Sequence, residues 1–546
     1  MEFNLAEVNE AVASANPDRE CIVHRDRRFT YADFTERTRR LANYLLDQGL
    51  GAHRERDGLA GWESGQDHLA LYLHNCPEYL EGMVGAYKAR VAPFNVNYRY
   101  VEEELRYLLR DARASAVVFH STFAPVLDAV RSQVDGLRVL IQVPDESGHP
   151  LLDGAVWYDD ALAAGSPAKP AVAWSPDDLY ILYTGGTTGM PKGVLWRQAD
   201  IFPAALGGRQ LGTGQEWPDL DTIVEASRAG GVRFMPAPPF MHGAAHWMAF
   251  NAFTGGHTIV LPSVTDTLDP ADVWSTVERE KVNILLIVGD AFGRPLLDEL
   301  EKREYDLSSM MMLVSGGAAL TAPVKKAFLD HIPNMAIMDG LGSSETGQQA
   351  SQVVGAGAEV TTGTFTPGPG MCIVNEEMTE VLPVDSDQLG WLAQSGRVPL
   401  GYFGDEDKTR KTFPVIGGVR YSVPGDRARY TPEGLLELHG RDSVTINSGG
   451  EKIFAEEVEH ALAHHPAVYD VVVAGRPSER WGNEVVAIVQ LRDGMEATEA
   501  DLLAECEKHI ARFKLPKAFV FVDKVVRSPS GKADYRWARE QAAAAQ

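Results

Sequence analysis

The sequence has few cysteines, and its apolar residues form no long run. The four cysteines, Cys21, Cys76, Cys372 and Cys506, are widely spaced and form no C-x-x-C pair. This spacing argues against both a disulfide framework and a zinc site. No segment approaches the roughly 18 consecutive apolar residues of a membrane-spanning helix, and the acidic N-terminus lacks the basic start and apolar core of a secretory signal. We therefore expect a cytoplasmic protein without an integral membrane segment.

Positive charge is also scarce. The chain has 51 lysines and arginines against 76 aspartates and glutamates, a net charge of −25. Such a surface disfavours nucleic acid and anionic membranes as partners. A hydrophobic content of 45% with 51 glycines and 31 prolines is ordinary for an α/β enzyme and argues against disorder. The 546 residues are enough for more than one domain.

Helical and strand-like patterns alternate through the first 440 residues, with strands expected at ASAVVFH (114–120) and HTIVLP (257–262). This alternation predicts an α/β fold with a large N-terminal domain, residues 1–441, in which helices flank β-sheets. We interpret the glycine-marked stretch 207–231 and the proline-rich MPAPPFMHG (235–243) as loops or an insertion.

A different pattern follows, and it predicts a small α+β domain over residues 442–546. An apolar stripe at Phe454, Val458, Ala461 and Leu462 predicts a helix. Strands are expected at YDVVVAG (469–475), EVVAIVQL (484–491) and AFVFV (518–522). A capping box starting at Thr498 predicts a helix over residues 498–511.

The segment YILYTGGTTGMPKG (180–193) follows an apolar run that predicts a buried strand. Glycine N–H groups, threonine hydroxyls and a lysine ammonium are suitable ligands for phosphate oxygens. The candidate donors are Thr184, Gly185, Gly186, Thr187, Thr188, Gly189 and Lys192. The segment is not a P-loop, because Pro191 precedes Lys192 and Gly193 follows it. Taken alone, it equally fits an ordinary connection between two strands.

Six segments together resemble the motifs of the adenylate-forming enzymes, the superfamily of acyl-CoA synthetases, luciferases and peptide-synthetase adenylation domains. Besides the 180–193 segment they are SGGA (315–318), GLGSSETG (340–347), GYFGDEDKTRKTF (401–413), VPGDRARYTPEGLLELHGRDSVTINSGGEKIFAEEVE (423–459) and SPSGKADY (528–535). Each alone is weak, but all occur in the order typical of the family. The resemblance covers nearly the whole chain and implies that the C-terminal domain is a mobile lid.

The resemblance also implies roles for the charged residues. The 184–193 loop would hold the β- and γ-phosphates of ATP, although Gly185 stands where the family usually has serine. Ser344 would donate a hydrogen bond to the α-phosphate, and Glu345 would hold Mg²⁺. Lys532 would bring its ammonium to the oxygens between carboxylate and phosphorus. In another context, Glu345 would be a solvated carboxylate and Lys532 a surface lysine in a turn.

Further positions match the nucleotide site of the family. Asp426 would accept hydrogen bonds from the ribose hydroxyls, and Arg441 would contact ribose or phosphate. Gly317 and Ala318 would lie against the adenine. Outside this context, the segment around Asp426 is a turn, and Gly317 and Ala318 form a tight turn after a strand.

The remaining assignments concern the acyl and CoA paths. The resemblance places His242 at the wall or gate of the acyl pocket, with a structural histidine as the alternative. His246 lies one helical turn later, but no accompanying ligand set supports zinc. Ser443 matches the hinge of the lid. Gly449 and Gly450 match the loop that lines the pantetheine tunnel.

The resemblance implies an acyl-CoA synthetase that would use ATP, Mg²⁺ and CoA to convert a carboxylic acid to its thioester. A luciferase-like oxygenase shares the motifs and stays open, whereas a peptide-synthetase domain would be followed by a carrier domain. If the protein were a noncatalytic nucleotide-binding protein, we would expect Glu345, Asp426 or Lys532 to be lost. All three are present.

The segments YTGGTTGMPKGVLWR (183–197), GSSETG (342–347), INSGGEKIFAEEVE (446–459) and SPSGKADYRWARE (528–540) most resemble bacterial synthetases for steroid side-chain carboxylates. Synthetases for long- and medium-chain fatty acids are the alternative. The apolar residues Phe240, Met241, Trp247 and Met248 fit either substrate. A homodimer is left open.

Overall fold

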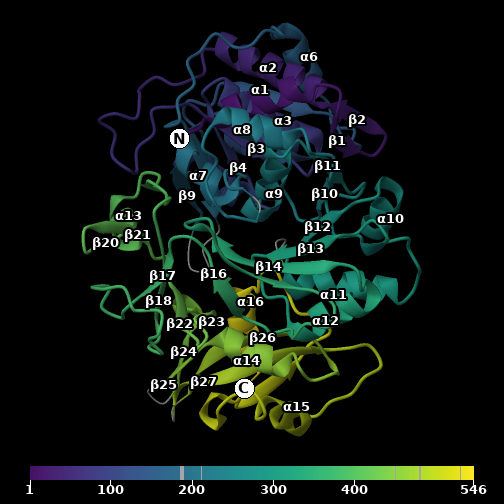
Figure 1. Cartoon of the computed structure of the whole chain (residues 1–546), viewed down its shortest axis with the longest axis vertical. Coiled ribbons are helices and arrows are strands. Elements are labelled where there is room, and N and C mark those ends of the chain that lie inside the picture. Colours follow the sequence, from purple (N-terminus) through teal and green to yellow (C-terminus); the bar gives the residue numbers. More distant parts are fainter. Residues whose placement is uncertain (185–189, 211, 449–450, 479–480, 529–530, 546) are drawn as a thin grey trace.

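The chain folds into a large N-terminal part, coloured purple to green in Figure 1, and a smaller part at the C-terminus, coloured yellow-green to yellow. The computed structural model describes residues 1–184, 190–210, 212–448, 451–478, 481–528 and 531–545. Strands within these ranges form four sheets, and helices pack against them, so the predicted α/β fold class is confirmed.

One five-stranded sheet is wholly parallel, in the order β4-β3-β5-β6-β7. Its strands are β3 (His68–Tyr72), β4 (Ala92–Asn95), β5 (Ala114–His120), β6 (Val139–Val143) and β7 (Val156–Trp157). The helices between and after them are α3 (Pro77–Lys88), α4 (Glu102–Asp111), α5 (Ala124–Arg131) and α6 (Tyr158–Ala164). Every residue of β5 is buried, as expected for a parallel strand covered on both faces. The ASAVVFH strand is confirmed.

The largest sheet is parallel from β1 to β14 and antiparallel from the β14–β15 hairpin onward. Its parallel half and edge contain β1 (Glu20–His24), β2 (Arg27–Thr30), β10 (Arg233–Pro236), β11 (Thr258–Leu261), β12 (Ile284–Ile287), β13 (Met312–Gly316) and β14 (Ala336–Ser343). Its antiparallel half contains β15 (Gly347–Val354), β16 (Thr364–Pro367), β17 (Met371–Val374), β18 (Gly390–Ser395), β20 (Val415–Ile416), β21 (Val419–Ser422), β22 (Asp426–Tyr430) and β23 (Leu436–Arg441).

Helices of the N-terminal part surround this sheet (Figure 1). They are α1 (Leu5–Ala15), α2 (Tyr31–Asp47), α9 (Gly243–Thr254), α10 (Pro270–Glu280), α11 (Gly289–Leu300) and α12 (Ala322–His331). The HTIVLP segment forms β11, which confirms that expected strand. The change from parallel to antiparallel pairing occurs at the turn of GLGSSETG, so this motif lies at an end of two strands.

A three-stranded sheet, ordered β19-β9-β8, carries the glycine- and threonine-rich segment. Its strands are β8 (Leu179–Thr184), β9 (Lys192–Arg197) and β19 (Gly401–Tyr402), and α7 (Gln198–Ala205) and α13 (Glu406–Thr412) follow β9 and β19. The first five residues of β8 are buried, which confirms the expected strand. The antiparallel register pairs Thr184 with Lys192. Strands β8 and β9 therefore pair as a hairpin, and residues 185–189 lie outside the described residues.

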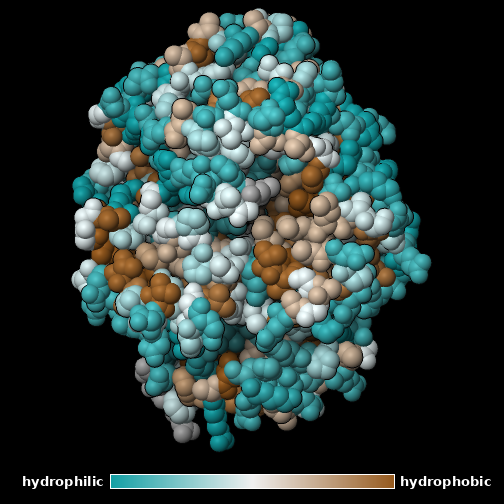
Figure 2. Space-filling model, in the orientation of Figure 1, coloured by the Kyte–Doolittle hydropathy of each residue, from teal (hydrophilic) through white to brown (hydrophobic). Residues whose placement is uncertain are grey.

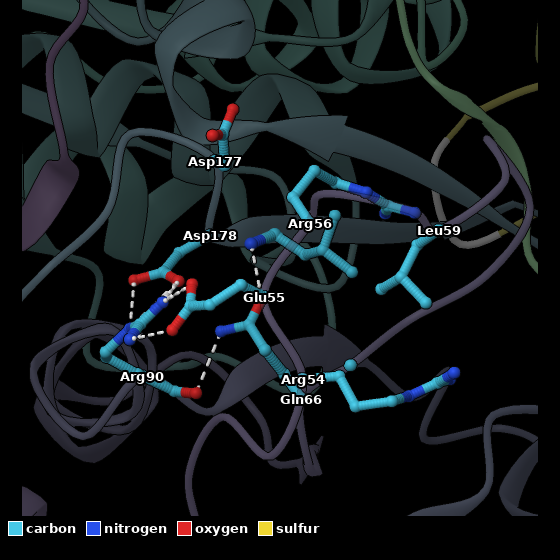
Figure 3. A pocket seen from close by; sticks show the side chains of 10 residues that line it. Arg54, Glu55, Arg56, Leu59, Gln66, Arg90, Asp177 and Asp178 are labelled. Atoms are coloured by element: carbon cyan, nitrogen blue, oxygen red, sulfur yellow. Dashed lines mark hydrogen bonds and ion pairs between the residues drawn. The ribbon is translucent and has the colours of Figure 1, made fainter.

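The start of β8 is fixed by a charged network that lines a small surface pocket (Figure 3). Arg90, two residues after the end of α3, donates hydrogen bonds to the carboxylates of Glu55 and Asp178 at 2.8–3.1 Å. The Gln66 side chain donates to the carbonyl of Arg90 and accepts from the Leu179 N–H. These charged groups satisfy one another, so we interpret the pocket as a structural anchor for β8.

Two segments that we expected to be loops contain regular structure. Residues 220–227 form α8 (Leu220–Ser227), because Asp219 caps the Thr222 N–H at 2.7 Å and Ile223 packs into the core. The first two residues of MPAPPFMHG end β10, which lies between β11 and β12. The prolines concealed this strand, because proline is usually confined to edge strands, first strand positions and bulges and so argues against a central strand.

The C-terminal part has its own sheet, β25-β24-β27-β26 with β28 beside β27. The strands are β24 (Ile446–Ser448), β25 (Glu451–Ile453), β26 (Val468–Ser478), β27 (Gly482–Leu491) and β28 (Ala518–Phe521), and the helices are α14 (Ala455–Leu462), α15 (Glu499–Cys506) and α16 (Tyr535–Ala544). All predicted elements are present, and Thr498 and Asp501 form the expected capping box. The helix at 498 ends five residues earlier than we expected.

Candidate active site

A tight turn between β14 and β15 presents Ser344 and Glu345. The Ser343 N–H donates to Thr346 Oγ1 at 3.0 Å, and the Trp196 indole donates to the Ser344 carbonyl at 2.9 Å. Gly347 ends the turn with φ of +68°, and a Cβ there would lie 2.8 Å from the Ala204 carbonyl oxygen. Glycine is required at this position because of the positive φ and the close Ala204 backbone. The close packing and the two hydrogen bonds hold Ser344 and Glu345 in place.

Two side chains from other motifs hold Glu345. Tyr402, which is buried, donates from its hydroxyl to Glu345 Oε1 at 2.8 Å. Ser422 donates from its hydroxyl to the Glu345 carbonyl at 2.6 Å. Tyr402 lies in the GYFGDEDKTRKTF motif, but no local pattern of residues indicated a function for it. Its position identifies it as the residue that orients the candidate Mg²⁺ ligand.

Asp426 and Arg441 lie opposite each other on β22 and β23. The Arg441 Nε donates to Asp426 Oδ1 at 3.1 Å. The Asp426 carboxylate raises the pKa of the Arg441 guanidinium, so this side chain stays charged. The pair therefore combines a fixed cation with a carboxylate at the C-terminal boundary of the large domain.

Lys532 comes from the other domain and meets these residues. A Cβ on Gly317 would lie 3.9 Å from Lys532 Cε, so the lysine stem runs alongside Gly317. The surrounding protein and the charge of Arg441 lower the pKa of the Lys532 ammonium, while the carboxylates of Glu345 and Asp426 oppose this shift. Lys532 nevertheless remains in contact with solvent. Together with Tyr402, these residues come from five of the six motifs.

The turn that carries Lys532 docks against the large domain. The Gly531 N–H donates to the Ser528 carbonyl at 2.8 Å, and a Cβ on Gly531 would lie 3.1 Å from the Ala291 Cβ in α11. A second contact between the domains is the hydrogen bond from the Tyr469 hydroxyl to Asp298 Oδ2 at 3.0 Å. This orientation places Lys532 toward the nucleotide motifs.

His242 and His246 have different surroundings. His242 precedes α9, and its buried Nε2 has no hydrogen-bond partner in the part of the chain that the structure describes. Burial, with the charge of Lys532 as the next cause, lowers the pKa of His242 to about 3, so the ring is neutral at physiological pH. In His246, Nδ1 donates to the Phe240 carbonyl at 2.8 Å and Nε2 accepts from the Tyr180 hydroxyl. Both nitrogens of His246 are thus bound by the protein.

The phosphate-loop residues are described only at the two ends of the hairpin. Thr184 ends β8, and Lys192 begins β9. The Lys192 Nζ lies 3.4 Å from Asp111 Oδ1 and 3.8 Å from Asp405 Oδ2. The predicted ligands Gly185, Gly186, Thr187, Thr188 and Gly189 lie outside the described residues, as do Gly449 and Gly450. Ala318 follows Gly317 and packs against the core beneath the site.

The chain matches the family described as AMP-binding enzyme over residues 9–402 and its C-terminal domain over residues 457–532. It belongs to this family. It is 56% identical to the medium-chain acyl-CoA ligase Mig of Mycobacterium avium, over 99% of this chain and 98% of that protein. It is 40% identical to the medium/long-chain-fatty-acid--CoA/3-oxocholest-4-en-26-oate--CoA ligase of Mycobacterium tuberculosis (strain CDC 1551 / Oshkosh), over 99% of this chain and 96% of that protein.

The fold of this AMP-binding enzyme is similar to that of the anthranilate CoA ligase AuaEII in complex with anthranoyl-AMP. The TM-score is 0.83, with 21% sequence identity and coverage of 100% of this chain and 98% of that one. The expected family and fold are therefore confirmed. The protein is an AMP-forming acyl-CoA ligase, which implies the use of ATP, Mg²⁺ and CoA.

The described residues fit these groups. No cluster of three or more His, Cys, Asp or Glu side chains suited to a metal ion occurs among them. The Glu345 carboxylate, oriented by Tyr402, fits Mg²⁺, which usually binds through one or two carboxylates together with substrate phosphates. Glu345 is the carboxylate that would hold it. None of the described helices has the length and apolar content needed to cross a membrane.

Proposed function

We propose that the residues around Lys532 activate a carboxylic acid with ATP. The observation that supports this most directly is the position of Lys532, beside Gly317 and near the charges of Glu345, Asp426 and Arg441. A lysine at this place supplies positive charge where a carboxylate and a phosphate must approach each other. Without that charge, two anions would repel each other.

The proposed reaction has two steps. In the first, a carboxylate oxygen attacks the α-phosphorus of ATP, and the bond to pyrophosphate breaks, which gives an acyl-adenylate. In the second, the CoA thiolate attacks the acyl carbonyl and AMP leaves, which forms the thioester. Ser344 and Lys532 would stabilise the charge on the α-phosphate, and Asp426 and Arg441 would hold the ribose. Mg²⁺ at Glu345 would neutralise phosphate charge during the first step.

The two steps would use two orientations of the C-terminal lid, residues 442–546. A separate core that extends from Val444 to Leu515 supports this boundary. The candidate hinge residue Ser443 lies in a single 3₁₀ turn that follows β23. Rotation there would withdraw Lys532 and bring the Gly449–Gly450 loop toward the site, where glycines would admit the narrow pantetheine arm.

We propose medium-chain fatty acids as the first substrate class and steroid side-chain acids as the second. The 56% identity to a medium-chain ligase supports the first class, and the 40% identity to a ligase named for both substrates supports the second. Both classes present an aliphatic carboxylate attached to an apolar body. Phe240 and Met241 are 0% and 2% exposed, so surrounding residues bury these two side chains. Trp247 is partly exposed.

A comparison of pyrophosphate release with different acids would test this assignment. Purified enzyme would be given octanoate, palmitate, 3-oxocholest-4-en-26-oate and benzoate separately, with ATP, Mg²⁺ and CoA. We expect kcat/KM for octanoate or the steroid acid to exceed that for palmitate at least tenfold, which corresponds to about 1.4 kcal/mol of transition-state binding. Equal or higher values for palmitate or benzoate would overturn the substrate assignment. The cytoplasmic location and the homodimer stay predictions.

A further inference from the structure

The side chain of Asn95, at the end of β4, connects two segments of the candidate site. Its Oδ1 accepts a hydrogen bond from the Tyr183 N–H at 2.8 Å. Its Nδ2 donates to the Tyr183 carbonyl at 2.8 Å and to the Met241 carbonyl at 2.7 Å. Both N–H donors of the amide and its oxygen are therefore engaged by backbone groups. Asn95 is only 9% exposed.

The two segments that Asn95 joins hold different reactants in the proposed reaction. Tyr183 immediately precedes Thr184, the first residue of the predicted phosphate loop. Met241 immediately precedes His242, the predicted acyl-pocket residue. The planar amide fixes the distance between these two backbones, because each bond is close to the ideal length and the side chain is buried.

A second buried asparagine holds only one of these segments. Asn75 donates to the Pro238 carbonyl at 2.9 Å and accepts from the Phe240 N–H at 2.6 Å. Both hydrogen bonds are within the segment 238–240. Asn75 is 3% exposed and Asn95 is 9% exposed, so both side chains are buried. It is therefore a matched control for the loss of a buried asparagine beside the acyl segment.

We propose that Asn95 is a positioning residue for acid activation, which holds the end of β8 at Tyr183, just before the predicted phosphate loop, against the segment that leads to His242. Attack on the α-phosphorus requires two separately bound reactants to meet in line, and small misplacements reduce such rates strongly. The thioester step starts from an acyl-adenylate in which carboxylate and phosphate are already joined. Asn95 therefore contributes mainly to the first step. This inference rests on the proposed acyl-CoA synthetase function.

The experiment compares Asn95→Ala with Asn75→Ala in the two half-reactions. The first is acid-dependent exchange of pyrophosphate into ATP, and the second is thioester formation from preformed acyl-adenylate and CoA. For Asn95→Ala we expect kcat of the exchange to fall about 10- to 100-fold, the range typical of misplaced reactants. KM for ATP and for the acid should change less than kcat, and the second half-reaction should stay near the native rate.

For Asn75→Ala we expect a higher KM for the acid with a smaller fall in the exchange kcat. Asn95→Ser replaces Asn95→Ala in the experiment if the alanine variant does not fold. A serine hydroxyl can replace at most part of the three hydrogen bonds of the amide, so this variant should show the same selective loss of the exchange reaction. Equal losses in both half-reactions for both Asn95 variants would assign Asn95 a purely structural role and overturn the proposal. Absence of exchange by the native enzyme with every acid would instead refute the underlying function.

Discussion

At the scale of single residues, neighbouring side chains limit the positions of Glu345, the proposed Mg²⁺ ligand. The carboxylate is held through Oε1 by the Tyr402 hydroxyl, and the backbone of Glu345 is held by Ser422. Lys408 places its ammonium 4.1 Å from the centre of the Tyr402 ring. Tyr402 thus has a fixed ring and a directed hydroxyl, and both limit the positions that Glu345 can adopt.

We expect Tyr402→Phe to raise the Mg²⁺ concentration needed for half-maximal adenylation by about tenfold, because partners that orient a metal ligand typically contribute 10–100-fold to affinity. Glu345→Gln should have a larger effect at limiting Mg²⁺, since an amide cannot balance the charge of the cation. Pyrophosphate release over a Mg²⁺ titration measures both. Tyr87→Phe is the control, because the buried Tyr87 hydroxyl has no hydrogen-bond partner among the described residues. An unchanged Mg²⁺ requirement in Tyr402→Phe would refute this role.

At the scale of elements, helix α14 lies directly beneath the boundary between the domains. A Cβ on Gly440 in β23 would lie 2.4 Å from Glu456 Oε2, so strand and helix are in close contact. Burial raises the pKa of Glu456 to about 7. Burial, and then the neighbouring Glu456, raise the pKa of Glu459 to about 8, although its Oε1 accepts from the Val473 N–H at 2.8 Å. The helix therefore carries two carboxyl groups that folding keeps protonated.

These shifts predict the direction in which pH changes stability. Well below pH 4.5 these carboxyls are protonated in both the folded and the unfolded chain, so they cost little stability. As the pH rises toward 7–8, the unfolded chain loses these protons while the folded chain retains them, and the free energy of unfolding decreases. Glu456→Gln and Glu459→Gln each remove a carboxyl group whose burial lowers stability at high pH. Each should therefore raise Tm more at pH 8 than at pH 5 in calorimetry. Glu507→Gln, at an exposed site, is the control. An equal change at both pH values would contradict the prediction.

At the scale of the whole molecule, the C-terminal domain presents one of its faces to the active site. In this orientation, Lys532 lies along Gly317 and Gly531 contacts α11. The Gly449–Gly450 segment lies elsewhere along the chain of the same domain, after β24. The exterior is mostly hydrophilic on the face shown in Figure 2, in agreement with the net charge of −25. Apolar side chains gather near β20 and β21, where Val415 and Val419 are exposed.

We expect Lys532→Ala to abolish acyl-adenylate formation while much of the thioester step survives when preformed acyl-adenylate and CoA are supplied. Gly450→Leu should do the opposite, because its side chain would fill the pantetheine path and leave the ATP site intact. Single-turnover assays of each half-reaction measure the difference. Lys524→Ala, which changes an exposed lysine of the same domain, is the control. Equal loss of both steps in Gly450→Leu would contradict the two-orientation proposal.

The sequence by itself determined the family, the fold class and most elements of the C-terminal domain. Local signals were sufficient there, since the Thr498–Asp501 capping box and the apolar strand patterns depend on neighbouring residues. Local signals failed at two elements. The glycines around α8 suggested a loop although Asp219 caps the helix, and the prolines after Met235 suggested a loop although packing stabilises β10. Six motifs indicated a nucleotide site, but their positions along the chain did not show how far apart their side chains lie in the folded protein.

Only the tertiary structure decided which side chains act on one another. Lys532 meets Gly317 across more than 200 residues of sequence, and Tyr402 meets Glu345 across 57. Asn95 shows the limit most clearly, because an asparagine at the end of a short apolar strand has no pattern that distinguishes it from a turn residue. Its role comes from two backbones that lie 88 and 146 positions further along the chain. Such contacts arise from the packing of β4 against β8, which no local pattern of residues specifies.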